Sequence, residues 1–370
     1  MREQFSNHRT AFARRKWPNV TWGLVTLSLL GIALVSIGVG SKSQVRKEQA
    51  FTALITKSYS GDVVAFSPDG KLLATAHRTN PAFFKVWDLE RGRLLQTVKT
   101  DQNGGIGLVA ISPDKTTVVT SGAHDDNRFL LWDVRTGEKT GQITSSNYDP
   151  QSLIFSPDSN WIINSGFSYV EFWDVSTSQL LRVWREDNGS VFVALMPDGE
   201  TLLMAGDSGI KLRNLQTGRL LRKVPFVTAN TKQYLKAALS PDGKTLAMGV
   251  RFGGGQPETI ELWDVGNGKL RLTLAENPGN KKGGKPAMKA LSFSRDNKLL
   301  ASSSNNQPVK LWNVQSGSLR ATLEAKVPTP VFTPDEKTVA FSPDGTTLAV
   351  GVHNEVHLWK VDALLKGGSQ

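Results

Sequence analysis

The stretch GNKKGGKP, residues 279–286, has the spacing of a phosphate-binding loop as far as Lys285. That pattern, G-x-x-x-x-G-K, requires a hydroxyl at the next position, to bind magnesium, and a helix that begins there. Pro286 takes the place of the hydroxyl, and the flanking sequence is typical of strands. We therefore expect no nucleotide site, but a flexible basic loop in which Lys281 and Lys282 are available to a protein partner.

Two further stretches bring histidine close to acids or arginine, HRTN at 77–80 and HDDNR at 124–128. A metal site needs three or four ligands that converge on one point, and neither stretch supplies them alone. No Ser, His or Asp stands outside the repeat pattern described below as a candidate nucleophile or base. The sequence therefore predicts no catalytic residue, no metal and no cofactor, and hence no enzyme.

The chain of 370 residues is 39% hydrophobic and contains 34 glycines, which indicates a globular, turn-rich protein with a large core. It has no cysteine, so disulfides, thiolate catalysis and cysteine-bound zinc are excluded. Of the net charge of +11, residues 1–48 carry +6, from eight Lys or Arg against two Glu. The +5 on the rest of the chain lacks the basic footprint of a nucleic-acid-binding protein.

Residues 17–41 form an uncharged, largely apolar run of 25 residues, which is long enough to cross a bilayer as a helix. Trp17 and Trp22 lie at the end that the basic run 14–16 flanks, as expected at a membrane interface. The positive-inside rule then predicts a cytoplasmic basic tail at 1–16 and a single-pass signal anchor. The chain after the anchor is expected to be extracytoplasmic, in a periplasmic or lumenal space.

A cleaved signal peptide is the competing interpretation of this segment, because Gly38 and Gly40 are small residues with suitable spacing. The apolar run, however, exceeds the usual signal core of about 7–15 residues. The RRKW stretch that precedes it faintly resembles a twin-arginine signal, but its flanks are poor. We expect an uncleaved anchor.

An apolar pair followed by Ser-Pro-Asp-Gly, or a close variant, occurs seven times. Proline presets the second position of a turn, Asp suits the third, and Gly accepts a positive φ before the next strand. The apolar runs on both sides predict antiparallel strands. The copies begin at Val64, Val109, Leu153, Val193, Ala237, Leu291 and Val339.

A second phrase follows each copy and ends a strand with Trp-Asp or a variant, with a turn and a further strand after it. Each unit is therefore expected to contain four short antiparallel strands. Apolar residues on both faces of the strands predict sheets packed between similar sheets, as in radial blades. The seven slots are Trp87-Asp88, Trp132-Asp133, Trp173-Asp174, Arg213-Asn214, Trp263-Asp264, Trp312-Asn313 and Trp359-Lys360.

These two phrases, in phase over about residues 51–362, resemble a WD-repeat protein of bacterial style. The resemblance implies an all-β fold, a seven-bladed β-propeller of four-stranded antiparallel blades, here preceded by one transmembrane helix. The family's Gly-His dipeptide before the first strand is absent from every unit. We therefore expect its His–Asp–Ser–Trp hydrogen-bond network to be missing, and blade packing to depend more on apolar contact.

The last unit reaches its third strand at 356–361 and then lacks a good outer strand, whereas 51–57 is a predicted strand without a blade. We predict that 51–57 is the outer strand of the last blade, which would close the ring and remove its open edge. Residues 42–50 are then a linker, 51–362 the propeller, and 363–370 a C-terminal tail.

The loops between second and third strands, and between consecutive units, are expected on one face, where propellers of this family commonly bind partners. Aromatic and arginine side chains are the usual anchors of protein interfaces. A second turn phrase within 327–345 predicts a small extra hairpin, or a flap for partner docking. The candidate protein-binding residues are His77, Arg78, Arg128, Tyr148, Tyr234, Arg251, Lys281, Lys282, Asn306 and His353.

The predicted function is a membrane-tethered, non-enzymatic scaffold that binds protein partners through this face. Residues 17–41 are expected to contact the membrane, and neither nucleic acid nor a small-molecule substrate is expected. The alternative is a quinoprotein-like or ligand-binding propeller with an axial site. Such a site needs polar side chains near the axis, whereas innermost strands such as VVAFS at 63–67 are largely apolar.

Arg213 stands in the fourth Trp slot, while the residues around it keep the repeat pattern. We expect its aliphatic stem to pack on the next blade and its head to reach outward. A stacking contact with Trp184 is a hypothesis, and a partner-binding role for Arg213 is the alternative.

Overall fold

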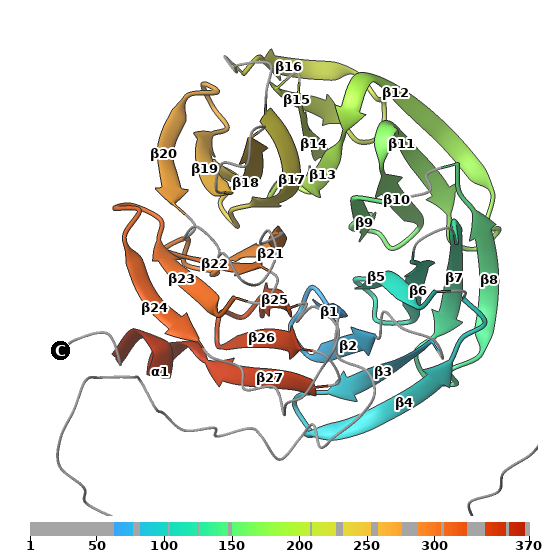
Figure 1. Ribbon diagram of the computed structural model, residues 1–370. Coiled ribbons are helices and arrows are strands. Elements are labelled where there is room, and N and C mark those ends of the chain that lie inside the picture. Colours follow the sequence, from blue (N-terminus) through green and yellow to red (C-terminus); the bar gives the residue numbers. More distant parts are fainter. Residues whose placement is uncertain are drawn as a thin grey trace, which may run out of the picture. The chain divides into compact units, whose positions relative to one another are not determined.

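The computed structural model of the protein (Figure 1) describes most of the predicted propeller. The chain divides into two compact units, Met1–Gln44 and Val45–Gln370, and all described residues belong to the second. The described ranges are 63–76, 82–102, 104–123, 126–146, 150–207, 209–226, 232–252, 258–275, 288–304, 307–323, 337–352 and 355–366.

Several predicted segments lie outside the described residues. They are the basic tail at 1–16, the anchor at 17–41, the linker at 42–50, the closing strand at 51–57 and all but one residue of the loop at 276–288 that contains GNKKGGKP. Within the described ranges, no helix combines the length and the apolar character needed to span a bilayer.

Seven antiparallel sheets follow one another around a ring, which confirms the predicted seven-bladed all-β architecture (Figure 1). The first strand of each blade lies nearest the axis and the fourth lies at the outside. Blade 1 contains β1 (Val63–Phe66), β2 (Leu72–Ala76), β3 (Phe83–Asp88) and β4 (Arg93–Lys99). Blade 2 contains β5 (Ile106–Ile111), β6 (Thr117–Gly122), β7 (Arg128–Asp133) and β8 (Lys139–Thr144). Blade 3 contains β9 (Ser152–Phe155), β10 (Trp161–Ser165), β11 (Phe167–Asp174) and β12 (Leu180–Ser190).

The remaining blades repeat this order. Blade 4 contains β13 (Phe192–Leu195), β14 (Thr201–Gly206), β15 (Gly209–Asn214) and β16 (Leu220–Val224). Blade 5 contains β17 (Lys232–Leu239), β18 (Thr245–Phe252), β19 (Thr259–Asp264) and β20 (Leu270–Ala275). Blade 6 contains β21 (Met288–Phe293), β22 (Leu299–Ser304), β23 (Val309–Asn313) and β24 (Leu319–Leu323). Blade 7 contains, among the described residues, β25 (Lys337–Phe341), β26 (Thr347–Val352) and β27 (Glu355–Lys360).

All seven Ser-Pro-Asp-Gly phrases form the predicted turn between first and second strands. The fourth position has a positive φ in every copy, including the three without glycine, Lys115, Ser159 and Asn297. Residues with a Cβ are strained in this left-handed region. In each of these three, the side chain bonds to the turn of the preceding blade, which offsets part of that strain. Lys115 Nζ pairs with Asp69 at 2.7 Å, and Asn297 Oδ1 accepts a hydrogen bond from the Asp242 amide at 3.1 Å.

The Asp of the Trp-Asp phrase is a turn acceptor, as its variants show. Asp133 Oδ1 accepts hydrogen bonds from the backbone amides of Arg135 and Thr136, and Asn214 Oδ1 accepts one from Thr217. Blade 7 has Lys360 in this place and therefore no such acceptor. There the chain continues into the short helix α1 (Val361–Lys366), which the sequence did not predict.

The core lies between the blades, with apolar side chains on both faces of each sheet. A shortened form of the family's hydrogen-bond network survives without histidine, so apolar contact is not the whole account of blade packing. Four of the slot tryptophans donate Nε1–H to a polar residue on the second strand. The pairs are Trp87–Thr75 (3.3 Å), Trp132–Thr120 (3.0 Å), Trp173–Asn164 (3.0 Å) and Trp312–Ser302 (2.9 Å).

Arg213 makes the predicted stacking contact, because its guanidinium lies over the Trp184 ring of blade 3 at 5.5 Å. The same guanidinium donates to Gly218 O at 3.1 Å and lies 3.4 Å from the Glu186 carboxylate, which also pairs with Lys211. Arg213 is thus held in the seam between blades 3 and 4. Its contacts are those expected of a residue that packs two blades together.

Candidate protein-binding surface

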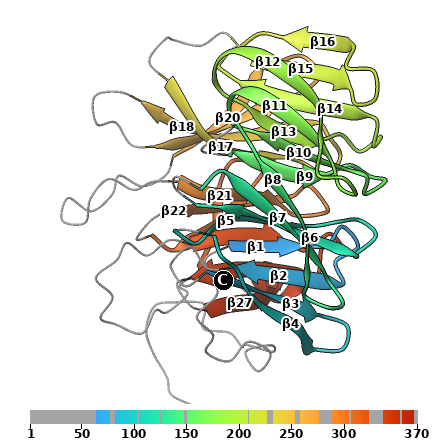
Figure 2. The same ribbon diagram turned by 90° about the vertical axis from the view of Figure 1, so that its right-hand side faces the viewer.

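Two opposite faces of the ring carry the connections between strands. Turns join strands 1 and 2 and strands 3 and 4 on one side, which we call the turn face. Connections between strands 2 and 3 and between blades lie on the other side, which we call the loop face. On the loop face, the eight-residue strands β17 and β18 project beyond the neighbouring strands as the blade 5 hairpin (Figure 2).

Arg251 lies near the end of the blade 5 hairpin and is held by a buried carboxylate. Its Nη2 and Nε lie 2.7 and 2.9 Å from Glu258 Oε1, and Glu258 is only 4% exposed. The other carboxylate oxygen accepts a hydrogen bond from the Met288 amide of blade 6 at 2.8 Å. Two charge-assisted contacts from the guanidinium to the same carboxylate oxygen hold it in one orientation. Arg251 is therefore preset at the surface.

Lys232 lies on β17, the other strand of the hairpin, and is likewise held by a buried carboxylate. Its Nζ lies 2.6 Å from Glu261 Oε1 and 5.6 Å from the centre of the Phe252 ring. Tyr234 lies beneath it, 4% exposed, with its ring 5.9 Å from that of Phe226. Burial, together with the negative charge of Glu261, raises the pKa of the Tyr234 hydroxyl, which therefore stays neutral. Tyr234 thus supports the hairpin from inside and does not lie at the surface.

Arg128 occupies the loop face of blade 2 and contacts acidic residues of two adjacent loops. Its guanidinium pairs with Asp126 at 2.8 Å and with the Asp101 carboxylate at 3.5 Å, and donates to Asp101 O at 2.8 Å. The hydrogen bond with Asp126 raises the pKa of Arg128 despite partial burial. These contacts order the start of β7 and leave the guanidinium about one-quarter exposed.

The structure describes three of the ten candidate residues. Arg251 and Arg128 are partly exposed on the loop face, whereas Tyr234 is buried beneath it. The other seven lie outside the described residues, so their role in partner binding remains a prediction. They are His77, Arg78, Tyr148, Lys281, Lys282, Asn306 and His353.

Sequence reasoning missed an exposed aromatic at the loop face of blade 3. Phe167 is 66% exposed and begins β11 one residue after the end of β10. Ser168 takes a positive φ there, so the hairpin turns without a polar loop. The sequence hinted at this exposed ring only through the short connection between β10 and β11. The other units have several polar residues at that place.

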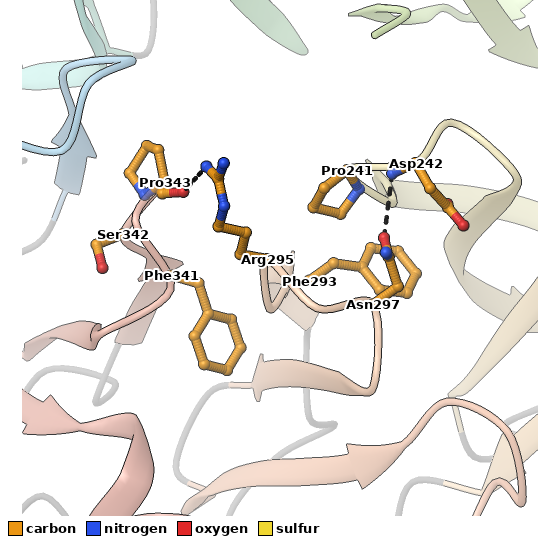
Figure 3. A pocket seen from close by; sticks show the side chains of 8 residues that line it. All are labelled: Pro241, Asp242, Phe293, Arg295, Asn297, Phe341, Ser342 and Pro343. Atoms are coloured by element: carbon orange, nitrogen blue, oxygen red, sulfur yellow. Dashed lines mark hydrogen bonds between the residues drawn. The ribbon is translucent and has the colours of Figure 1, made fainter.

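The turn face carries a pocket of about 510 Å³ among the turns of blades 5, 6 and 7 (Figure 3). Phe293 and Phe341 contribute their rings to its wall, and Arg295 stands where the other six copies have proline. Arg295 Nη1 donates to Pro343 O at 2.5 Å and so links blade 6 to blade 7. Within the described ranges, no three His, Asp or Glu side chains are grouped so that they could hold a metal ion.

Comparisons with known proteins agree with this geometry. The chain is 29% identical to the WD repeat-containing protein WDS homolog of Arabidopsis thaliana over 264 residues, which cover 68% of this chain and 47% of that protein. It is 28% identical to F-box/WD repeat-containing protein 4 of Mus musculus, over 47% of this chain and 44% of that protein. The chain folds as a seven-bladed β-propeller and is similar in sequence to WD-repeat proteins.

The chain is also similar to a third protein. Periodic tryptophan protein 2 of Arabidopsis thaliana is 25% identical over 69% of this chain and 28% of that protein. No protein-family model matches the sequence. The matched region spans less than half the length of each of these relatives. All three are eukaryotic, so the comparisons give no support to a specifically bacterial type of WD repeat.

Proposed function

We propose that this propeller is a non-enzymatic protein-interaction scaffold whose loop face binds a protein partner, with the blade 5 hairpin as a principal contact. A WD-repeat-type ring supports this proposal, because such rings typically bind proteins. The single observation that carries it is the arrangement of Arg251, partly exposed at the projecting open end of the blade 5 hairpin and fixed by the buried Glu258.

An arginine held in this way suits a protein interface for a physical reason. Binding normally costs free energy because long side chains lose rotamer freedom. Here the rotamer is already set by two contacts within the blade, so less of that cost remains. Arginines are frequent among the residues that dominate interface energies. The expected partner surface offers an acidic or carbonyl group to Arg251.

The test is chemical crosslinking in intact cells, followed by purification of the tagged full-length chain. Arg251→Ala should reduce the amount of a specific crosslinked protein about tenfold. Arg320→Ala, which removes an exposed arginine from the outer strand β24, serves as the matched control and should change nothing. Equal recovery of the crosslinked protein from both variants would contradict the proposal.

We also propose that residues 17–41 anchor the propeller to a membrane and that the propeller is extracytoplasmic. Support comes from the uncharged run of 25 residues and from the basic residues that flank its start. Protease added to intact cells or sealed vesicles checks the side. Cleavage of the propeller before the cytoplasmic side is opened agrees with the proposal, and cleavage only afterwards reverses the topology.

A further inference from the structure

The pocket of the turn face lies beside a turn that differs from all the others. Of the seven turns between first and second strands, the turn of blade 6 is the one that lacks both the proline of the second position and the glycine of the fourth. Arg295 and Asn297 stand in these two places, and both residues line the pocket of about 510 Å³. The pocket therefore coincides with a local break in the repeat pattern.

The residues at this break change how the turns of neighbouring blades meet. In three blade pairs, the proline of one turn lies beside the glycine of the next turn. These pairs are Pro157–Gly199, Pro197–Gly243 and Pro343–Gly70. At blade 6 the contact is altered on both sides, because Asn297 faces the blade 5 turn and Arg295 faces Gly345. Longer polar side chains thus stand where a proline ring would lie on a glycine, and the pocket lies among them.

The wall of the pocket is partly aromatic. Phe293 and Phe341 end the first strands of blades 6 and 7, and their rings lie apart from each other (Figure 3). The two residues are only 6% and 7% exposed, so their rings are fixed by the cores in which they pack. Small-molecule sites have volumes of about 300–1,000 Å³ and are largely apolar with a few polar groups. The volume and the lining are therefore those of a site for a small ligand with a flat apolar part.

The side-chain groups that are left for a ligand are hydrogen-bond donors. Arg295 Nη1 donates to Pro343 O at 2.5 Å, which holds the guanidinium beside the pocket. Within the described ranges, Arg295 Nε and Nη2 and Asn297 Nδ2 have no hydrogen-bond partner. Ser342 Oγ, by contrast, already donates to Asp344 at 2.5 Å. A ligand that satisfies this pocket must therefore supply acceptors.

Three aspartates lie near Arg295 but are bonded within their own turns. Asp242, Asp296 and Asp344 each accept a hydrogen bond from the serine that begins the turn, at 2.6, 2.7 and 2.5 Å. The carboxylate of Asp242, the acidic residue of the lining, points away from Arg295 (Figure 3). Burial raises the pKa of Asp344, but hydrogen bonds within its turn and the nearby charge of Arg295 outweigh burial and lower it. The Nε and Nη2 donors of Arg295 remain available to a ligand.

We propose that this pocket binds a small ligand that combines an aromatic part with a carboxylate. The aromatic part packs against Phe293 and Phe341, in the offset or edge-to-face contacts that rings prefer. The carboxylate accepts hydrogen bonds from Nε and Nη2 of Arg295, because its two oxygens match the two parallel N–H groups on one side of a guanidinium. Asn297 Nδ2 is a further donor. This site lies on the turn face, so the inference goes beyond the scaffold proposal for the loop face and does not depend on it.

The experiment uses a photoreactive probe of this chemistry, 4-benzoylbenzoate, whose benzophenone group attaches to a nearby C–H group under ultraviolet light. The full-length chain in detergent is irradiated with the probe and digested, and mass spectrometry locates the labelled residues. The matched control ligand is 4-benzoylbenzamide, which has the same rings without the charge. We expect label in the peptides that contain Phe293 or Phe341, and about tenfold less of it with the amide at equal concentration.

Protein variants test the guanidinium directly. Arg295→Gln removes the charge and should lower labelling by the carboxylate about tenfold, to the level of the amide. Arg295→Lys keeps the charge without the paired N–H groups and should lose less than Arg295→Gln. Arg135→Ala is the matched control, because Arg135 is another exposed arginine at a turn of this face, and it should have no effect. Thermal unfolding of each variant checks that the fold is kept.

Three results would overturn the inference. They are the absence of label from the pocket peptides at about 1 mM probe, equal labelling by the carboxylate and the amide, and labelling that Arg295→Gln leaves unchanged. The partner contact at Arg251 lies on the other face and is measured separately. The scaffold proposal and this inference can therefore fail independently.

Discussion

Arg213 is the residue at which the repeat pattern is broken and the packing is nevertheless complete. Its cation–π contact with Trp184 and its ion pair with Glu186 replace the buried indole of the other blades. Met204 lies on β14 opposite Lys211, where blades 1, 2, 3 and 6 place the hydroxyl or amide that accepts the indole N–H. A tryptophan at position 213 would therefore lack that acceptor.

A double-mutant cycle tests this contact. Arg213→Ala should lower the free energy of unfolding by about 1–2 kcal/mol, because it leaves Glu186 with Lys211 as its one remaining cationic partner among the described residues. The coupling energy with Trp184→Ala should be about 0.5–1 kcal/mol, measured by urea unfolding. A coupling energy of zero would show that the stacked geometry does not contribute to stability.

Trp312 and Trp263 form a matched pair for measuring what the indole hydrogen bond contributes to stability. Trp312 Nε1 donates to Ser302 at 2.9 Å, whereas Trp263 Nε1 has no hydrogen-bond partner within the described ranges, because Met248 takes the acceptor's place. Trp312→Phe should therefore lower the free energy of unfolding by about 1 kcal/mol more than Trp263→Phe. Equal losses in chemical unfolding would mean that ring volume alone decides the cost.

The carboxyl group of Asp69 gives a prediction for how the stability of the fold depends on pH. Burial raises the pKa of this carboxyl, but hydrogen bonds from Lys115, Ser67 and the Lys71 amide outweigh it and lower the pKa to about 2. Because the folded pKa lies below the ordinary value of 3.8, this stabilisation is fully present above about pH 4 and is lost as pH falls through about 2. The stability difference between the natural chain and Asp69→Asn should shrink over that range in urea unfolding. A difference independent of pH would exclude the charged pair with Lys115 as its source.

At the scale of the element, the turns between first and second strands combine two opposing effects. Asn297 is strained by its positive φ and bonded to the Asp242 amide of the preceding blade. Both Asn297→Ala and Asn297→Gly remove the bond, but only alanine keeps the strain. Asn297→Ala should therefore be less stable than Asn297→Gly by about 1 kcal/mol in urea unfolding. Equal stabilities would show that this turn relaxes to another conformation.

The strands and turns could be predicted from the sequence because they depend on local chemistry that recurs seven times. Proline, Asp and a residue with positive φ determine one turn, and an Asp or Asn acceptor determines the other. The length of β12, the short helix α1 and the buried Glu258 beneath Arg251 could not be predicted in this way. Each of them depends on a contact between segments that are specific to one blade, and a repeat pattern carries no information about such contacts.

At the scale of the whole molecule, the two faces of the ring differ in the contacts that their charged side chains make. The turn face is tied together by contacts between successive blades, such as Lys115 with Asp69 and Arg295 with Pro343. The loop face instead projects a hairpin with preset charged groups. Similarity to the two WD-repeat proteins compared covers up to 68% of this chain but less than half of each relative, so the partner is a matter for experiment.

Site-specific photocrosslinking in living cells tests the scaffold proposal most directly. The photoreactive residue p-benzoylphenylalanine is placed in the full-length chain at Phe252 on the loop face or at Lys244 on the turn face. We predict a discrete crosslinked protein from position 252 and none from position 244. Crosslinks from position 244 alone, or from neither position while the chain remains folded, would contradict a loop face that binds a protein partner.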